Sequence, residues 1–381
     1  MNEVWRCPLC PELPGWRVDL PALWDRFAWL RPLRDTPQDP KYHAEGDVWT
    51  HLGMVLKVLS TRPAFRALNE VDRNIVFAAA LLHDISKPEC TVIDEDGRIK
   101  SPNHSVRGVY KARRILTEDP AFGPDGTPFH TREAILALVR WHGLPVQFLG
   151  KPDPTRAVLR PSFTTRYDLL TILADADHRG RILSEPTDSA DKIALFPDFC
   201  REQQVWDGPY PFANDHSRFT YFRTETAHPT LHLFDDTKCE VTMMAGLPGG
   251  GKSTWIAANA HGRAVVSLDD IRDELGVTPT DDQAPVIALA YERAKELLRK
   301  REDFIWNATS ITRILRDKLI HIASDYGARI KIVYVEPSIP EVRRRNRGRA
   351  KVVPESAWNR MFDRLDVPTL TEAHSVEYIL T

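Results

Sequence analysis

One segment restricts the fold of this chain more than any other: the glycine-rich run GLPGGGKST, from Gly246 to Thr254. It fits the pattern G-x-x-x-x-G-K-[ST] in full, and it lies between a strand-like segment, EVTMMAG, and a segment expected to be helical from near Lys252. Glycines in such a turn let backbone N–H groups approach phosphate oxygens, and the N-terminus of the following helix favours an anion. The sequence therefore predicts a binding site for a nucleoside triphosphate.

Each residue type in this loop has a physical reason to be there. Lys252 brings positive charge to the β and γ phosphates, and the Ser253 hydroxyl can hold the Mg²⁺ that accompanies ATP or another nucleoside triphosphate. The predicted nucleotide-binding residues are Gly246, Leu247, Pro248, Gly249, Gly250, Gly251, Lys252, Ser253 and Thr254.

The pattern of apolar residues divides the chain into two unlike halves. After Cys239, strand-like segments (AVVSLDD, DFIWNATS and ARIKIVYVE) alternate with helical ones, which predicts a parallel α/β sheet. From Val48 to about Leu183 the patterns are helical and nothing alternates like a strand. We therefore expect a multidomain α and α/β protein. Its parts are an all-α domain in residues 1–185 with an irregular lead-in over 1–40, an ordered connecting module in 186–238, and a phosphate-loop domain in 239–381.

Composition excludes several classes of protein. A chain of 381 residues is too long for one ordinary core, and a net charge of −2 gives no global attraction to nucleic acid. The five cysteines form no disulfide framework, and the C-x-x-C of Cys7 and Cys10 lacks the second half of a zinc site. The first residues, MNEVWRCPLC, show no basic region followed by an apolar core, so we expect no secretory signal, and no apolar run approaches the ~18 residues of a membrane span. These features predict a cytoplasmic protein with no membrane partner.

A second polar motif follows the next predicted strand. In AVVSLDDIR, Asp269, Asp270 and Arg272 lie at a strand-to-helix turn, beside the phosphate loop if the sheet is parallel. A carboxylate there can accept a proton from an attacking hydroxyl, and an arginine one turn later can bind a phosphate. The alternative is a helix N-cap with a salt-bridged arginine. The N-K-x-D motif of a GTPase and a Walker-B strand are both missing, so the sequence favours a phosphotransferase over a switch or a motor.

A run of cations lies further along, in EVRRRNRGRAKVVP. It places six of them in nine residues: Arg343, Arg344, Arg345, Arg347, Arg349 and Lys351. One interpretation is a solvated helix face. The other is a mobile lid that brings arginines to the γ-phosphate, where transition-state charge needs cations.

Together these motifs resemble the 5′-OH polynucleotide kinases of RNA repair. The block G-x-P-G-x-G-K-S-T-W, then D-D-x-R, then NATS, then R-N-x-x-R with a following V-P, carries the resemblance. It implies that Asp269 is the general base, that Arg272 binds the 3′-phosphate of the acceptor nucleotide, and that Arg349 is the lid arginine. Arg345 would be its companion, and Arg347 competes for the lid role. The family usually shows D-x-T-N where this chain has NATS, from residue 307 to 310.

The N-terminal half contains an apolar helix with an unexpected end. NIVFAAALLHD runs without a polar residue from Ile75 to Leu82, and then His83 and Asp84 follow. Such a helix should be buried, and two polar groups at its end are costly to bury without partners. The partner is either a hydrogen-bonded helix end or a metal. Further histidines and acids lie at the ends and inner faces of successive predicted helices: His51, His104, His142, Asp175 and Asp177. Such groups can converge in a helical bundle, where di-metal sites are built, and imidazole and carboxylate suit Zn, Mn, Fe, Co or Ni.

This order of residues resembles the HD phosphohydrolase superfamily. The resemblance implies two transition-metal ions, held by His51, His83, Asp84, His104, His142 and Asp177. Asp177 is preferred to Asp175 because the last ligand of that family lies in A-D-x-x-G-R, and His130 competes with His142. Lys87 would face the substrate phosphate.

The two halves together resemble the bacterial bifunctional HD phosphohydrolase–polynucleotide kinases. The resemblance implies that the first half removes 2′,3′-cyclic and 2′-phosphates from RNA ends and that the second phosphorylates 5′-OH ends. RNA or DNA ends would be substrates, and an RNA ligase would act downstream. Two other hypotheses remain: a small-molecule or nucleoside kinase fused to an HD nucleotide phosphohydrolase, and a nucleotide-gated sensor that binds nucleic acid without modifying it.

Overall fold

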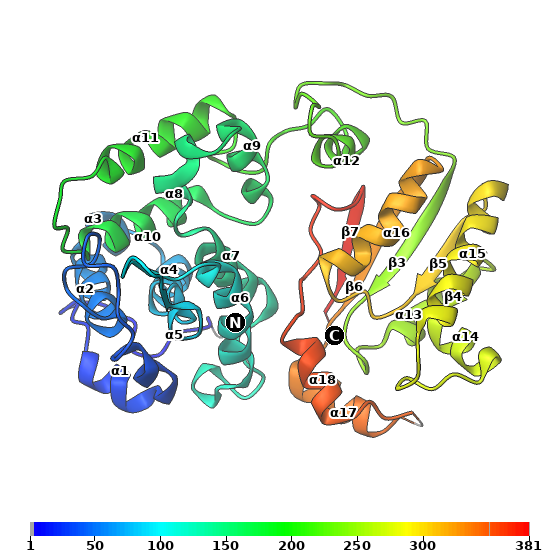
Figure 1. The fold of residues 1–381 in the computed structure, drawn as a ribbon, viewed down its shortest axis with the longest axis horizontal. Helices are drawn as coiled ribbons and strands as arrows, with labels where there is room; N and C mark the ends of the chain where they lie inside the picture. Colours follow the sequence, from blue (N-terminus) through cyan, green and yellow to red (C-terminus); the bar gives the residue numbers. More distant parts are fainter. Residues whose placement is uncertain (1–3, 350, 381) are drawn as a thin grey trace. The chain divides into compact units, whose positions relative to one another are not determined.

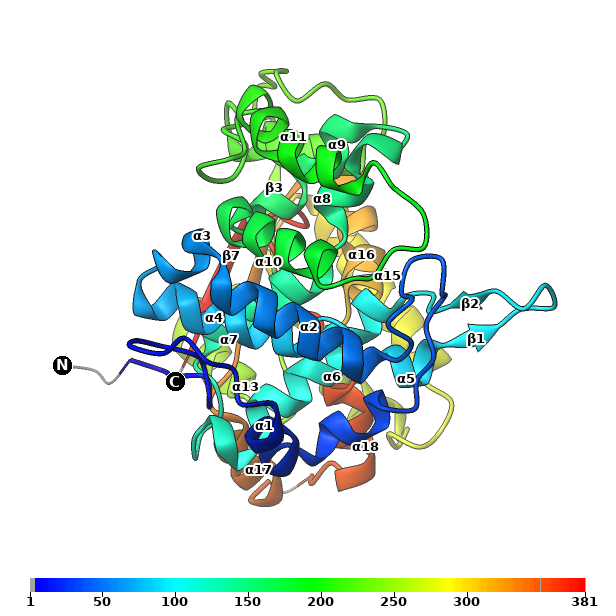
Figure 2. The same cartoon turned by 90° about the vertical axis from the view of Figure 1, so that its left-hand side faces the viewer.

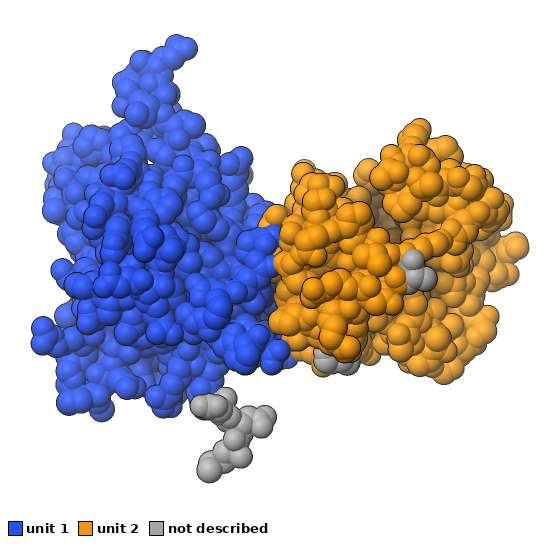
Figure 3. All heavy atoms as spheres, turned by 90° about the horizontal axis from the view of Figure 1, so that it is seen from below, with its two compact units in different colours: residues 1–211 blue, residues 212–381 orange. Residues whose placement is uncertain are grey.

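The computed structural model describes residues 4–349 and 351–380. The chain forms two compact units, residues 1–211 and residues 212–381 (Figure 3). The boundary between them falls inside the segment 186–238, so that part of this segment belongs to each unit. Among the described residues, no helix combines the length and the apolar character needed to cross a membrane.

In its described residues, from residue 4 onward, unit 1 has helices and one short antiparallel hairpin (Figure 1). Its elements are α1 (Leu20–Arg26), η1 (Ala28–Leu33), α2 (Val48–Thr61), α3 (Pro63–Arg66), α4 (Glu70–Leu82), α5 (Lys87–Cys90), β1 (Val92–Ile93), β2 (Ile99–Lys100), α6 (His104–Glu118), η2 (Pro120–Phe122), α7 (Phe129–Trp141), α8 (Leu144–Gln147), η3 (Phe148–Gly150), α9 (Pro154–Leu159), η4 (Pro161–Phe163), α10 (Tyr167–Arg179) and α11 (Ser189–Glu202).

Helix α4 lies at the centre of this unit. Asn69 caps its N-terminus by accepting the N–H of Asp72, and the apolar run from Ile75 to Leu82 is buried. The helix packs against α2, α7 and α10, and Figure 2 shows α2 beside α4 and α10. The prediction that this apolar helix lies inside a domain is therefore confirmed, and its C-terminus at His83 lies in the interior.

Helices α2 and α10 approach each other unusually closely. Gly180, at the C-terminus of α10, lies against Val55 of α2, and a Cβ built on Gly180 would lie 2.8 Å from the Val55 Cα. Val55 is one turn beyond His51 on the same face of α2. Only glycine fits this contact, which holds the two helices together near His51 and Asp177.

Unit 2 contains the second part of the segment 186–238 and the C-terminal third of the chain. Its elements are α12 (Asp215–Arg223), β3 (Cys239–Ala245), α13 (Lys252–Asn259), β4 (Ala264–Ser267), α14 (Leu268–Leu275), α15 (Ala284–Lys300), β5 (Phe304–Asn307), α16 (Arg313–Asp325), β6 (Ala328–Val335), α17 (Ile339–Arg347), α18 (Glu355–Phe362) and β7 (Ser375–Ile379).

The strands of unit 2 form one parallel sheet in the order β4-β5-β3-β6-β7. The predicted α/β architecture is confirmed, with β7 as a strand that the sequence patterns did not predict. Strand β3 is central and almost wholly buried. The carboxyl ends of parallel strands share one edge, so β3, β4 and β5 all deliver their following loops there (Figure 1).

The segment expected as a connecting module is ordered and packs at both of its ends. Helix α11 packs against α8 and α10 in unit 1, where Phe196 is fully buried. In unit 2, Asn214 caps α12, and Phe219 stacks on His374 with ring centroids 4.1 Å apart. The aromatic residues of this segment therefore serve two hydrophobic cores.

Candidate metal centre and phosphate-binding site

The six side chains predicted as metal ligands meet inside unit 1. They come from five helices or helix ends, α2, α4, α6, α7 and α10, and form two adjoining groups: His51 with His83 and Asp177, and Asp84 with His104 and His142.

Asp84 joins the two groups. Its Oδ2 lies 3.2 Å from Nε2 of His83, and its Oδ1 lies 3.5 Å from Nε2 of His104. On the far side, Nε2 of His51 lies 3.0 Å from Oδ1 of Asp177. The His104 side chain is 27% exposed, whereas the other ligand candidates are buried, so the cluster opens toward solvent at His104.

Backbone carbonyls fix the orientation of three of these histidines. The Nδ1 atoms of His83, His104 and His142 each lie 2.8 Å from a backbone oxygen three residues earlier in the chain. A carbonyl oxygen can only accept, so each Nδ1 carries a proton and each Nε2 faces the cluster, where it can bind a metal once it carries no proton. Metal-ligating histidines have this same arrangement.

The cluster contains buried polar atoms that need a further partner. Nε2 of His83 and Oδ1 of Asp84 are buried and make no hydrogen bond of good geometry within the described residues. Nε2 of His104 lies 3.3 Å from Nε2 of His142, and two lone pairs at this distance repel unless a proton or a cation lies between them. A set of imidazole nitrogens and carboxylate oxygens in this state fits divalent transition metals.

Burial and neighbouring charges set the protonation states of the ligand candidates. Burial and then the nearby charge of His83 lower the pKa of His142 to about 3, so its ring is neutral. Burial would raise the pKa of Asp84, but the charges of His83 and Lys87 outweigh it and hold the pKa well below its usual range. A neutral imidazole and an ionised carboxylate are the forms that bind metal.

Two cations border the cluster. Nζ of Lys87 lies 2.7 Å from Oδ2 of Asp84 and donates to Oε1 of Gln38 at 2.6 Å. Arg181 pairs with Asp177 and, through its guanidinium, adds positive charge on the same side as α10. Both cations could offset the charge of a bound phosphate.

The alternatives weighed from the sequence occupy other places. Asp175 pairs with Arg62 at 2.9 Å and with Arg179 at 2.7 Å, outside the cluster. His130 lies on the exposed surface of α7. Asp177 and His142 are the members that the fold brings to the cluster.

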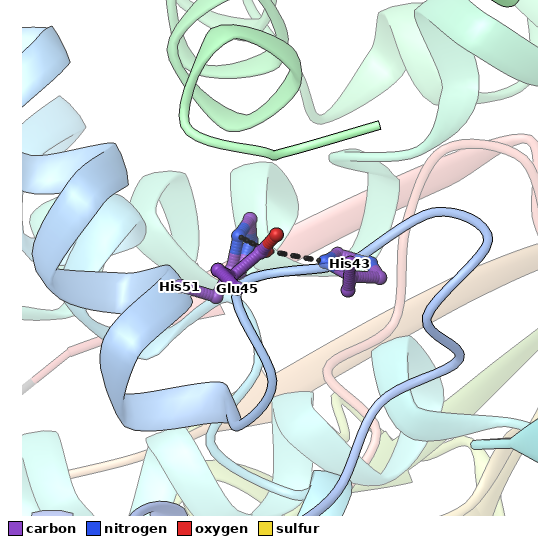
Figure 4. A group of neighbouring side chains, drawn as sticks. All are labelled: His43, Glu45 and His51. Atoms are coloured by element: carbon purple, nitrogen blue, oxygen red, sulfur yellow. Dashed lines mark hydrogen bonds and ion pairs between the residues drawn. The ribbon is translucent and has the colours of Figure 1, made fainter. Parts of the chain in front are cut away.

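Sequence reasoning missed two further groups, His43 and Glu45, which adjoin His51 (Figure 4). Oε1 of Glu45 lies 2.8 Å from Nδ1 of His43 and 2.9 Å from Nδ1 of His51. Burial would raise the Glu45 pKa, but the contacts with His43 and then His51 outweigh it and hold the pKa well below its usual range. These residues lie in a coil segment with no periodicity, so the sequence did not indicate that their side chains point toward the cluster.

The second site lies in unit 2, at the carboxyl edge of its sheet. The predicted loop joins β3 to α13, which begins at Lys252. Gly246 has φ 135°, and a Cβ there would lie 2.4 Å from the Val335 carbonyl oxygen, so the loop requires glycine at this position. Nζ of Lys252 donates to the carbonyls of Gly246 at 2.8 Å and Leu247 at 3.0 Å, so its charge points into the loop.

The aspartate and arginine after β4 lie beside this loop. Nη1 of Arg272 donates to Oδ1 of Asp269 at 2.5 Å, and the Asp269 side chain is 64% exposed. The N-cap of α14 is Ser267, which accepts the N–H of Asp270, so Asp269 is not used as the cap. The salt bridge of the alternative interpretation is present, and it leaves the rest of the Asp269 carboxylate accessible.

The run of arginines contains members with different surroundings. Arg344 and Arg345 pair with Glu341, and Arg343 pairs with Glu355. Burial and then the charge of Arg349 lower the Lys252 pKa to about 8, so the charge of Arg349 acts on Lys252. Arg345 also reaches the phosphate loop, since its Nη1 lies 3.7 Å from the position of a Cβ built on Gly251.

Other predicted residues of the second site are also close to the loop. Ser253 and Thr254 are exposed in the first turn of α13. The N–H of Gly246 donates to the Thr309 carbonyl at 2.9 Å, and Nδ2 of Asn307 lies 3.5 Å from the Ser267 hydroxyl. The NATS segment therefore supports the loop through its backbone and faces the end of β4.

Comparisons with known proteins agree with this division of the chain. Residues 48–180 match the family model of the HD domain, and residues 241–368 match a family model described as an AAA domain. Among solved structures, a candidate kinase from Chloroflexus aurantiacus J-10-fl is 17% identical over 38% of this chain and 87% of its own, with a TM-score of 0.34. A gluconokinase from Sinorhizobium meliloti 1021 is 22% identical over 38% of this chain and 83% of its own, with a TM-score of 0.28.

The two matches agree with the chemistry of the two sites. An HD domain implies divalent metals, in agreement with the His/Asp cluster of unit 1, and a kinase-like domain implies a nucleotide with Mg²⁺. These domain types suggest phosphohydrolase and kinase activity. The chain therefore joins a helical HD domain, residues 48–180, to a kinase-like phosphate-loop domain with a parallel five-stranded sheet, residues 241–368.

Proposed function

We propose that the protein heals nucleic-acid ends with two activities in one chain. Unit 2 transfers the γ-phosphate of ATP or another nucleoside triphosphate to a 5′-OH end. Unit 1 removes a 2′,3′-cyclic phosphate or a 2′-phosphate from an RNA end. The products, a 5′-phosphate and free terminal hydroxyls, are the ends that an RNA ligase acting downstream would join.

The observation that carries the kinase half is the Asp269–Arg272 pair beside the phosphate loop. Asp269 accepts the proton of the attacking hydroxyl, and Arg272 binds the phosphate attached to the acceptor nucleotide. Lys252 and Arg349 offset charge on the transferred phosphoryl group, and Ser253 holds Mg²⁺. The 64% exposure of Asp269 supports a long acceptor, because a base at an open edge can reach the end of a polymer.

The observation that carries the phosphohydrolase half is the set of inward-facing Nε2 atoms together with two anionic carboxylates. His51, His83, Asp84, His104, His142 and Asp177 would hold two divalent ions such as Mn, Co, Ni, Zn or Fe. Bound ions of this kind supply Lewis acidity toward water and the phosphoryl group. Lys87 and Arg181 add positive charge for the substrate phosphate, and the opening at His104 gives an RNA end its approach.

One assay separates this proposal from its rivals. The full chain is given radiolabelled ATP with a 5′-OH oligonucleotide, and in parallel with nucleosides or gluconate. Transfer to the oligonucleotide alone supports end healing. Transfer to the small molecules alone would support a small-molecule kinase, and nucleotide binding without transfer would support a sensor.

The phosphohydrolase half needs its own substrate. An oligoribonucleotide that ends in a 2′,3′-cyclic phosphate should release inorganic phosphate when Mn²⁺ is present, and His83→Ala should abolish the release. If free nucleotides were hydrolysed and the RNA end were not, the first unit would be a nucleotide phosphohydrolase.

A further inference from the structure

The segment Thr36–Asp47 precedes the residues that match the HD domain, yet it borders the metal cluster. Its two ends are joined by a bridge between Pro37 and Asp47. Backbone hydrogen bonds from Gln38 to Gly46 and from Val48 to Thr36 close it further. A loop held in this way can present a side chain in a fixed direction.

Glu45 is the residue that this loop places against the cluster. Its side chain is 1% exposed. Oε1 faces the Nδ1 atoms of His43 and His51, as Figure 4 shows, and Oε2 accepts the N–H of Ile182 at 2.8 Å. One carboxylate thereby joins the loop to α2, which carries His51, and to the chain just after α10, which carries Asp177.

His51 differs from the other three histidines of the cluster in what lies behind it. His83, His104 and His142 are anchored by backbone carbonyls, which no side-chain substitution removes. Behind His51 lies a carboxylate, 2.9 Å from Nδ1. The contact has the distance of an ion pair without the alignment of a full hydrogen bond, and the well-aligned bond to Oε1 comes from His43. We therefore expect the negative charge of Glu45 to influence His51 more than any hydrogen bond between the two side chains does.

We infer that Glu45 is a positioning residue of the metal site: its negative charge beside Nδ1 of His51 favours a proton on Nδ1, which leaves the Nε2 lone pair for the metal. The inference rests on the proposed phosphohydrolase site. A carboxylate behind a ligating imidazole fixes its tautomer and raises its basicity, and loss of such a partner typically lowers metal affinity about 10- to 100-fold. The loop 36–47 is, on this inference, part of the site rather than a lead-in to the fold.

A separate metal ion between His43, Glu45 and His51 is a less suitable explanation. Both histidines direct Nδ1 at the same oxygen, at 2.8 and 2.9 Å, and this oxygen already accepts a well-aligned hydrogen bond from His43. A metal there would have to replace the proton of His43 and would take the carboxylate away from His51.

The test is Mn²⁺ binding by the full chain, measured by competition with a chromogenic chelator, with no substrate present. Glu45→Gln keeps the shape of the side chain and removes its charge, so its affinity for Mn²⁺ should fall about 10- to 100-fold. Glu45→Asp keeps the charge and should lose less. Glu185→Gln is the matched control, since Glu185 pairs with Lys41 of the same loop, with both side chains more than half exposed, and its affinity should equal that of the wild type.

Each outcome decides between separate hypotheses. If the wild type binds Mn²⁺ and Glu45→Gln binds it equally well, the inference is wrong while the metal site stands. If Glu45→Gln loses one whole equivalent of Mn²⁺ and keeps the rest at unchanged affinity, Glu45 is a ligand of a separate ion. A wild type that binds no metal would overturn the metal site and this inference together. If Glu45→Gln does not fold, as judged by circular dichroism, the Mn²⁺ affinity of Glu45→Asp is the test. Its shorter side chain withdraws the carboxylate from His51, so an affinity equal to that of the wild type would count against positioning.

Discussion

Substituting Gly180 by alanine tests whether the close approach of α2 and α10 holds the metal cluster together. The added Cβ would lie 2.6 Å from Cγ2 of Val55 and 2.8 Å from its backbone N and Cα. Two of these three atoms are backbone, so rotating a side chain cannot relieve the clash and the two helices must separate.

The magnitude follows from two opposing effects. Overpacking costs about 1–3 kcal/mol, and backbone contacts place this case near 3 kcal/mol. Replacing glycine by alanine in an accessible conformation returns about 0.4–1 kcal/mol through the unfolded state, and Gly180, at φ −79°, has such a conformation. The net loss is about 2 kcal/mol, which for a domain of this size lowers the melting temperature by about 4–8 °C.

Differential scanning calorimetry of the metal-free protein would measure this change. ATP should raise the transition of unit 2, so the transition that ATP leaves in place belongs to unit 1. Gly150→Ala is the matched control within unit 1, because a Cβ there meets nothing within 4 Å. It should leave the melting temperature unchanged or raise it slightly. Because Val55 lies one turn from His51, Gly180→Ala should also weaken Mn²⁺ binding. A Gly180→Ala protein that melts and binds Mn²⁺ like the Gly150→Ala control would refute the packing argument.

Four further predictions concern the two sites. Lys252→Ala should abolish transfer of phosphate to a 5′-OH oligonucleotide and leave phosphate release intact, because the loop belongs to a separate folding unit; loss of both activities in a folded protein would contradict the two-site proposal. The Lys252 pKa of about 8 means that its charge is present below that pH and lost above it, so nucleotide affinity should fall as the pH rises through about 8. In Lys252→Arg, which stays charged, a fluorescent nucleotide titration between about pH 7 and 9.5 should show no such fall. Asp269→Asn should lose about 10²–10⁴-fold in turnover with ATP binding retained. If Asp269→Asn stayed active and Asp270→Asn were inactive, Asp270 would be the base instead. A chelator should stop phosphate release, and Mg²⁺ alone should then restore the kinase; an unaffected release in protein shown to be metal-free would leave His83 as an ordinary buried helix end.

The sequence alone determined the architecture of both units, because each depends on local signals. The glycine loop between an apolar strand and a helix is a contiguous motif, and its backbone geometry follows from residues that are neighbours in the chain. The helices that carry His51, His83, His104 and His142 were predictable from the spacing of their apolar residues, since the period of a helix fixes which side chains share its buried face. Strand β7 was missed because SVEYI is short and only partly buried, so its apolar residues give no clear alternation.

The tertiary structure decided what spacing within one element cannot. The period of α10 does not show which of Asp175 and Asp177 faces the cluster, and the packing of α10 on α2 through Gly180 turns Asp177 inward and leaves Asp175 to Arg62 and Arg179.

Glu45 lay beyond prediction for a different reason. A loop has no period, so the direction of its side chains depends on backbone bonds such as the one from Gln38 to Gly46 and on contacts with distant parts of the chain such as Ile182. The sequence thus determined which groups each half of the chain has available for chemistry. Only the packing of distant segments decided which of those groups meet, because a contact across the fold depends on how helices and loops pack and not on the residues beside it in the chain.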